Sequence, residues 1–143
     1  MCPIGNGLNA RQVRLLQTEL MVAALTCRSN PALNLDSKYG NFARRFGPEL
    51  KTHAEALKAE FKGNSTRLDR YVTSIANASS DVSLADGRYC EKVGALFDAV
   101  LAVKPGTLGN FAAQKADSFA AAHAAGVAGC TGEKAKTRTA KKQ

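Results

Sequence analysis

The sequence predicts an all-α protein, a single-domain bundle of about five helices stapled by one or two disulfides. Apolar residues recur at spacings of three and four along most of the chain, and no segment alternates convincingly with a period of two. Alanine is abundant and tryptophan is absent, which favours closely packed helices over a β-sandwich. A length of 143 residues suits one domain with a substantial core. No internal repeat of 20–50 residues is visible.

The stretch from Leu8 to Cys27 is predicted to be the central helix. One apolar stripe runs along it at helical spacing, formed by Val13, Leu16, Leu20, Ala24 and Cys27. Leu15, Val22 and Leu25 lie on the opposite side, so residues 20–25 are apolar almost all round. A helix of this kind is usually buried on several sides. Asn9 is a plausible N-cap, and Pro31 prevents the helix from continuing.

Two further helices are predicted before residue 63. Asp36 can cap a helix over 37–46, and Pro48 suits the first turn of another over 48–62. Lys62 and Gly63 form a typical helix stop. The residues expected to face inward are Tyr39, Phe42 and Phe46 in the first of these helices, and Leu50, Ala54, Leu57 and Phe61 in the second.

The second half of the chain predicts three more helical segments. Asn64 or Ser65 caps the first, residues 79–81 interrupt it, and Ser83 caps the next main helix. A final alanine-rich helix is expected over 107–124, after the break at 104–106. The inward residues are expected to be Leu68, Tyr71, Val72, Ile75 and Ala76, then Tyr89 or Cys90 with Val93, Leu96, Phe97, Val100 and Leu101, and lastly Leu108, Phe111, Ala112, Phe119 and Ala122.

The net charge of +8 is unevenly distributed. The segment 131–143 supplies half of it, with Glu133 as its one acidic residue and five basic ones, Lys134, Lys136, Arg138, Lys141 and Lys142. It has no large apolar residue, so we expect a helical domain over 1–130 and a disordered basic tail over 131–143.

The four cysteines, Cys2, Cys27, Cys90 and Cys130, are widely spaced and include no CxxC pair. This pattern argues against a zinc site and favours two disulfides in an exported protein over four reduced, buried thiols. An unbroken helix from residue 9 to 27 is about 27 Å long, which separates Cys2 from Cys27. Two of the three pairings are left. Cys27–Cys90 with Cys2–Cys130 is the simpler, because it links the termini and ties the first helix to the core.

Export is the expected location, either periplasmic or secreted. The opening MCPIGNG has neither a basic nor an apolar signal-peptide region. Because of the cysteines, we favour a signal peptide that has been removed over one that never existed. No apolar run approaches the roughly 20 residues of a membrane-spanning helix.

The segments RLLQTELMVAALTC through NFARRF, RYVTSIANASSD and RYCEKVGALFDAVL resemble short exported helical proteins of alphaproteobacteria that have no established activity. The resemblance covers most of residues 8–101 and rests on core patterns and on two cysteines. It implies export and a Cys27–Cys90 bridge, and it transfers no catalytic residue.

No catalytic constellation is evident. His53 and His123 lack a recognisable nucleophile motif, and the expected interpretation is two ordinary helical histidines. Asp81 and Asp86 flank a polar stretch that could bind calcium, but their spacing is not that of an EF-hand. Turn and capping roles are therefore favoured over a metal site. We expect no enzyme activity and no cofactor.

Two classes of function stay open. The favoured one is an exported, non-catalytic binding or adaptor module for a protein, a glycan or a small ligand. The other is a binder of nucleic acid or another polyanion, which would use the tail together with Arg44, Arg45, Arg67 and Arg70 if their helices adjoin. Aromatic residues are not interleaved with these cations, so the pattern of single-strand binders is weak. The sequence does not indicate the oligomeric state.

Overall fold

The computed structural model describes residues 6–130, and the regular secondary structure of that part of the chain is all helical, with no strand. Six α-helices and three short 3-10 helices follow one another: α1 (Asn6–Thr26), η1 (Cys27–Ser29), η2 (Pro31–Leu33), α2 (Leu35–Arg45), α3 (Gly47–Glu60), α4 (Ser65–Ala85), α5 (Tyr89–Leu101), α6 (Leu108–Lys115) and η3 (Ala116–Ser118). The predicted all-α class is confirmed, with six helices rather than about five. The predicted tail, residues 131–143, lies outside the described residues.

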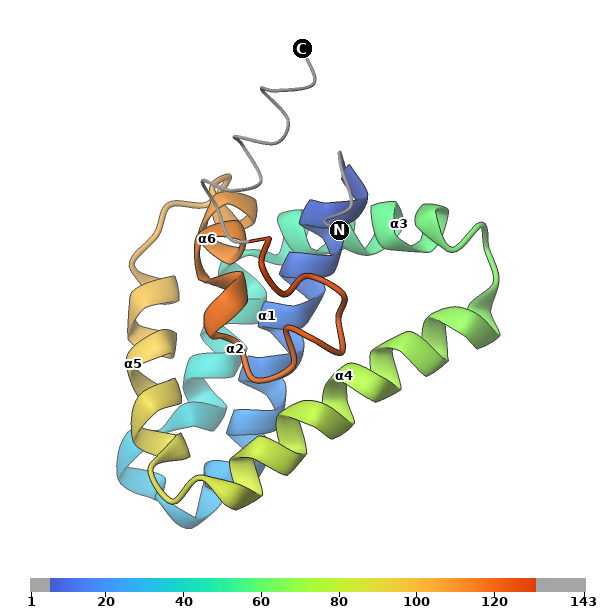
Figure 1. The fold of residues 1–143 in the computed structure, drawn as a ribbon. Coiled ribbons are helices and arrows are strands. Elements are labelled where there is room, and N and C mark those ends of the chain that lie inside the picture. The colour runs from blue at the N-terminus through green and yellow to red at the C-terminus, as the bar shows by residue number, and fades with distance from the viewer. Residues whose placement is uncertain (1–5, 131–143) are drawn as a thin grey trace.

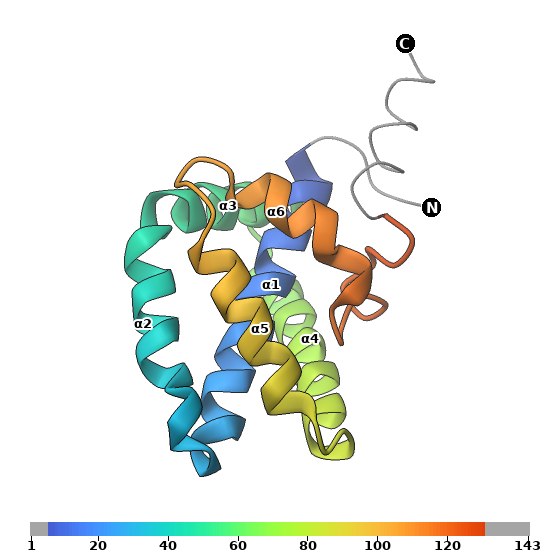
Figure 2. The ribbon, with the colours of Figure 1, turned by 90° about the vertical axis from the view of Figure 1, so that its left-hand side faces the viewer.

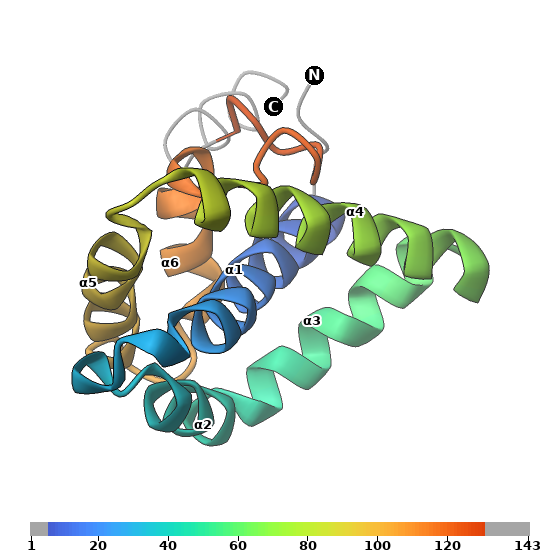
Figure 3. The ribbon, with the colours of Figure 1, turned by 90° about the horizontal axis from the view of Figure 1, so that it is seen from below.

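Helix α1 is the central element, as predicted. The other five helices all pack against it, with α2 and α3 on one side and α4, α5 and α6 on the other (Figure 3). Leu15, Leu16 and Leu20 are fully buried. Leu25 is the exception to the expected all-round burial, because 56% of it is exposed.

The start of α1 differs from the prediction. Asn9 lies inside the helix and is not its N-cap. Its side-chain amide donates to the carbonyl oxygen of Gly109 on α6 at 3.0 Å. A Cβ at position 109 would collide with the Asn9 side-chain amide, so a larger residue there would force Asn9 to move and would disturb this bond.

One large apolar core surrounds α1, and Ala10, Leu57 and Phe61 form a second, smaller cluster. The largest members of the main core that are fully or almost fully buried are Leu15, Leu16, Leu20, Phe42, Phe46, Ile75, Phe97, Val100, Leu108 and Val127. Most of these residues were predicted from periodicity to face inward. Ala54 was also predicted to face inward, but it is exposed, whereas Leu57 and Phe61 of the same predicted stripe are buried.

The capping predictions were right for α4 and wrong for α2. Asn64 caps α4, and its side-chain oxygen accepts from the backbone N–H of Arg67 at 3.1 Å. Lys62 and Gly63 have positive φ angles and end α3, as predicted. For α2, however, Asn34 is the N-cap, and Asp36 is the second residue of the helix, where it pairs with Arg28. A carboxylate in the first turn is favourable to the helix dipole.

The predicted interruption at residues 79–81 does not occur. Helix α4 continues to Ala85, and Ser79 is fully buried within it. Ser83 is not a cap, because its hydroxyl donates to the carbonyl oxygen of Ser80 in the same helix. The real break is at residues 86–88, and α5 then begins at Tyr89. Ser79 and Ser83 are buried and α4 packs against α1, so tertiary packing keeps this polar stretch helical.

The predicted last helix over 107–124 ends early, at Lys115. The chain continues as a short 3-10 helix and then as turns, although its sequence is rich in alanine. Tertiary bonds hold this segment against α1 and α4. Gln12 donates to the carbonyl oxygen of Cys130 at 2.9 Å, and the Tyr71 hydroxyl donates to that of Ala125 at 2.6 Å. In Figure 1 the segment crosses in front of α1.

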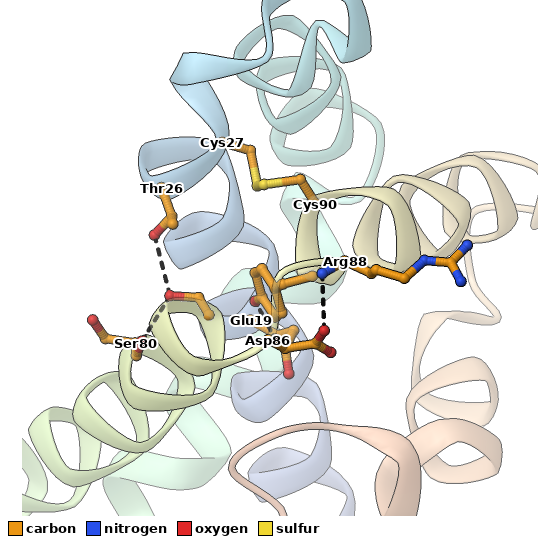
Figure 4. The surroundings of a disulfide bond; sticks show 9 residues. Glu19, Thr26, Cys27, Ser80, Asp86, Arg88 and Cys90 are labelled. Atoms are coloured by element: carbon orange, nitrogen blue, oxygen red, sulfur yellow. Dashed lines mark hydrogen bonds between the residues drawn. A yellow bond between two sulfur atoms is a disulfide. The ribbon is translucent and has the colours of Figure 1, made fainter.

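A disulfide joins Cys27, just after α1, to Cys90 in the first turn of α5, with a Cα–Cα distance of 5.7 Å (Figure 4). This confirms one of the two predicted bridges. The second predicted bridge is Cys2–Cys130. Of its two cysteines, Cys130 is buried and is not a free thiol. Its predicted partner, Cys2, lies outside the described residues, so the Cys2–Cys130 pairing stays a prediction.

The described helices were also searched for membrane spans. None of them combines the length and the apolar character that crossing a bilayer requires.

Candidate functional site

A pocket of about 370 Å³ lies where α1, the end of α4, the first half of α5 and the segment after η3 meet. Its size falls in the range of small-molecule sites. The residues that line it are Glu19, Val82, Asp86, Tyr89, Lys92, Val93, Leu96, Ser118, Phe119 and Ala120. Figure 2 shows α5 and the segment after η3 side by side across α1.

Glu19 is the most deeply buried charged group in this pocket, with only 3% of the residue exposed. One of its carboxylate oxygens accepts from the Tyr89 hydroxyl, and the other accepts from the backbone N–H of Ala120 at 2.8 Å. Both donors are neutral. Within the described residues 6–130, no ion pair includes Glu19.

Tyr89 fixes the carboxylate from the α5 side. Burial raises the pKa of the Tyr89 phenol well above its usual range, and the negative charge of Glu19 and the hydrogen bond to it act in the same direction. The phenol therefore stays protonated at neutral pH and can only donate to Glu19. Tyr89 therefore holds the Glu19 carboxylate in place from α5.

Asp86 and Lys92 form the polar edge of the pocket. The Lys92 ammonium lies 2.8 Å from a carboxylate oxygen of Asp86, and the backbone N–H of Arg88 donates to the other oxygen at 2.9 Å. The hydrogen bonds from Lys92 and Arg88 lower the pKa of Asp86. Asp86 is also the C-cap residue of α4. The same residue therefore ends α4 and lines the pocket.

The remaining lining is mainly apolar. Val93 and Phe119 are buried, while Val82 and Leu96 are partly accessible. The disulfide is next to this region in sequence and in space, because Cys90 follows Tyr89 directly (Figure 4). It ties the start of α5 to the end of α1, the two helices that supply Tyr89 and Glu19.

The structure does not bring the four candidate anion-binding arginines together. Arg44 and Arg45 lie on α2, and Arg67 and Arg70 lie on α4, on the other side of α1 (Figure 3). Arg45 donates two hydrogen bonds to the carbonyl oxygen of Val103, and so provides a partner for this backbone carbonyl just after α5. Arg67 stacks over the Phe61 ring. The tail cations Lys134, Lys136, Arg138, Lys141 and Lys142 lie outside the described residues.

The metal candidates are not grouped either. Asp81 is exposed on α4, and Asp86 is occupied by Lys92 and Arg88. Among residues 6–130, no three His, Cys, Asp or Glu side chains converge as a metal site would require.

Neither histidine lines the pocket of about 370 Å³. His53 is half-buried on α3, beside Arg14 and Gln17 of α1. Burial lowers the pKa of His53, against the opposing effect of Glu49. His123 is exposed in the segment after η3.

Sequence reasoning missed Glu19, the central residue of this site. A signal was present, because Glu19 is the only charged residue between Leu15 and Cys27 of the most apolar helix. A charge in such a stretch indicates a buried and specifically hydrogen-bonded group. Tyr89 or Cys90 was predicted to face inward, but periodicity could not show that Tyr89 bonds to Glu19.

Comparison of the chain with models of known protein families, with curated proteins and with solved structures finds no match.

Proposed function

We propose that this protein is an exported, non-catalytic binding protein that holds a small organic ligand in the pocket between α1, α4, α5 and the segment after η3. The observation that carries the proposal is an apolar pocket of about 370 Å³ with one buried, fixed carboxylate, Glu19. Concave, mostly apolar sites with a few oriented polar groups are typical of ligand pockets.

The chemistry of the lining supports binding more than catalysis. No histidine or cysteine is among the pocket residues, and the Tyr89 phenol is held protonated. Ser118 is the only hydroxyl-bearing residue of the lining besides Tyr89, and its hydroxyl donates to the carbonyl oxygen of Lys115 at 2.6 Å. A nucleophile would need a base within hydrogen-bond reach.

The Cys27–Cys90 disulfide supports the exported location. Structural disulfides persist in the periplasm and outside the cell, and reducing cytosols disfavour them. The bridge also holds the start of α5 against the end of α1, and so helps the pocket to keep its shape outside the cytosol.

A pocket-blocking variant tests the proposal. Val82 lines the pocket but is 38% exposed, so Val82→Trp can fill the entrance without disturbing the core. Leu84→Trp is the matched control. It lies on the same helix, is 78% exposed and does not line the pocket. Both variants and the wild type are screened by thermal denaturation against a panel of amines, carboxylates, alcohols and sugars.

We expect one chemical class to stabilise the wild type and the Leu84→Trp variant, and to have no effect on Val82→Trp. A ligand at 100 times its Kd adds about 2.7 kcal/mol to the unfolding free energy, which such a screen detects readily. The proposal fails if no class stabilises the wild type, or if the stabilisation persists in Val82→Trp.

A further inference from the structure

We infer that the pocket selects an organic amine, a ligand whose ammonium group binds Glu19 and whose apolar body lies against the pocket walls. This inference rests on the proposed function and names its ligand class.

The charge of the lining is opposite in sign to that of the protein. The chain carries a net charge of +8, but the acidic and basic side chains in the pocket lining are two carboxylates, Glu19 and Asp86, and one ammonium, Lys92. Lys92 is already paired with Asp86 at 2.8 Å. The lining therefore has one uncompensated negative charge, and it is at Glu19.

Glu19 has room for a cationic partner. A carboxylate offers about four lone-pair directions. Two of the lone-pair directions of Glu19 accept hydrogen bonds, one from the Tyr89 hydroxyl and one from the backbone N–H of Ala120. A carboxylate buried with only neutral donors is poorly compensated for the water it has lost. A ligand ammonium would supply both the missing charge and further hydrogen-bond donors.

The walls suit the rest of such a ligand. Val93 and Phe119 are buried residues of the lining, and the more exposed Leu96 and Val82 add further apolar surface. An alkyl or aryl group attached to the ammonium would cover these side chains. The Tyr89 ring lies in the same lining and presents a further aromatic surface to the bound cation.

An anionic ligand fits this arrangement poorly. Its charge would face Glu19 at the base of the pocket, where like charges repel strongly in a partly dry environment. The only cation in the pocket lining is Lys92, and an anionic ligand would have to separate Lys92 from Asp86 in order to pair with it. A neutral ligand would leave the Glu19 charge as it is.

The test uses three probes that differ mainly in charge: 2-phenylethylamine, 2-phenylethanol and 3-phenylpropanoate. Binding to the full chain is measured by isothermal calorimetry at neutral pH, with wild type, Glu19→Gln and Val82→Trp. Glutamine can keep both bonds of Glu19, because its oxygen can accept from Ala120 and its amide can donate to the Tyr89 oxygen. Circular dichroism checks that each variant is folded.

We expect the wild type to bind the amine about tenfold or more tightly than the alcohol, and the carboxylate most weakly. Glu19→Gln should remove the preference for the amine and leave alcohol binding unchanged, and Val82→Trp should abolish binding of all probes. If Glu19→Gln does not fold, the order of the three probes on the wild type still decides the question.

Equal binding of amine and alcohol, or a preference for the carboxylate, would overturn the amine inference. If Val82→Trp abolished that binding, the pocket would still be the ligand site and the proposed function would stand. An unchanged amine preference in a folded Glu19→Gln variant would also overturn the inference, and it would leave Glu19 with a structural role only. Absence of binding by all three probes contradicts the inference. The broader screen of wild type against Val82→Trp then decides separately whether the pocket binds another class.

Discussion

Buried polar side chains in this protein differ in how well they are satisfied. Glu19 has a hydrogen bond to each carboxylate oxygen, and Gln12 donates to the carbonyl oxygen of Cys130. The hydroxyls of Thr18 and Ser79 are also buried, yet they have no hydrogen-bond partner within the described part of the chain. An unpaired buried hydroxyl costs about 1–3 kcal/mol, so these two positions reduce the stability of the fold.

Replacing Ser79 tests this cost. Ser79→Ala removes the unpaired hydroxyl and adds a better helix former inside α4. We expect the unfolding free energy to rise by about 1 kcal/mol, measured by urea denaturation. Ser74→Ala is the control on the same helix. The exposed Ser74 hydroxyl donates to the carbonyl oxygen of Tyr71 at 2.8 Å, so its loss should bring no comparable gain. A loss of stability in Ser79→Ala would show that its hydroxyl is paired in solution.

Tyr71 makes the stability of the folded protein depend on pH in the alkaline range. Burial raises the pKa of Tyr71 to about 12, against the opposing effect of Arg11. In the unfolded chain the phenol titrates near pH 10. The folded state thus favours the neutral phenol, and this contribution is complete below about pH 10 and is lost as the pH rises toward 12.

The Tyr71→Phe variant separates this contribution. It loses the hydrogen bond to Ala125 and should be less stable than the wild type at neutral pH. It should also lose less additional stability above about pH 10, because it has no phenol at this position to ionise. Denaturant titrations at several pH values measure both effects. Parallel pH profiles for the two proteins would contradict the pKa assignment.

At the scale of elements, α1 organises the fold. It contacts every other helix, and its buried leucines come from more than one side of its surface. Leu20 is fully buried, whereas Gln17 on the same helix is partly exposed. The contrast between these two residues tests whether α1 is central in solution.

Leu20→Ala should lower the unfolding free energy by about 2–5 kcal/mol, because it leaves a cavity in a closely packed interior. Gln17→Ala should cost much less. Thermal or urea denaturation of both variants measures the difference. Small and equal effects would place α1 at the surface.

The Cys27–Cys90 bridge connects two elements that also form the candidate site. The cysteines are 63 residues apart, and a loop of this length corresponds to about 4 kcal/mol in the chain-entropy model. The double variant Cys27→Ala/Cys90→Ala should therefore melt at a markedly lower temperature. Its binding to pocket ligands should also weaken, because α5 and Tyr89 are less firmly held against Glu19. An unchanged melting temperature would show that packing alone fixes α5.

For the whole molecule, charge separates the two classes of function. Half of the net charge of +8 comes from residues 131–143. Within the described body, Arg11, Arg28, Lys38, Arg88 and Lys92 are all in ion pairs. A binder of polyanions would thus depend strongly on the terminal cations.

Deletion of residues 131–143 distinguishes the two functions. For a pocket-binding protein, we expect ligand affinity and melting temperature to change little, since none of the pocket residues is removed. For a polyanion binder, deletion would remove up to about five ion contacts and flatten the salt dependence of duplex DNA binding by about 0.9 log units per contact. Measurements of both kinds of binding against salt concentration decide between them. Loss of physiological ligand binding at an unchanged melting temperature would favour the polyanion class.

The sequence by itself determined the local features of this protein. Apolar spacing identified the helices and most of the core, and Asn64 and Gly63 marked helix ends, because caps and periodicity depend on neighbours within a few residues. The length of the first helix narrowed the cysteine pairings, and Cys27–Cys90 followed as the simpler choice.

Only the tertiary structure decided where α4 ends, why the predicted helix over 107–124 stops at Lys115, and where the pocket lies. Each depends on partners distant in the sequence. Glu19 accepts from Ala120, 101 residues away, and Tyr89 reaches Glu19 across 70 residues. Local propensity favoured a helix over the alanine-rich segment, but long-range hydrogen bonds and burial against α1 outweighed it, because propensity differences are small beside the energy of packing.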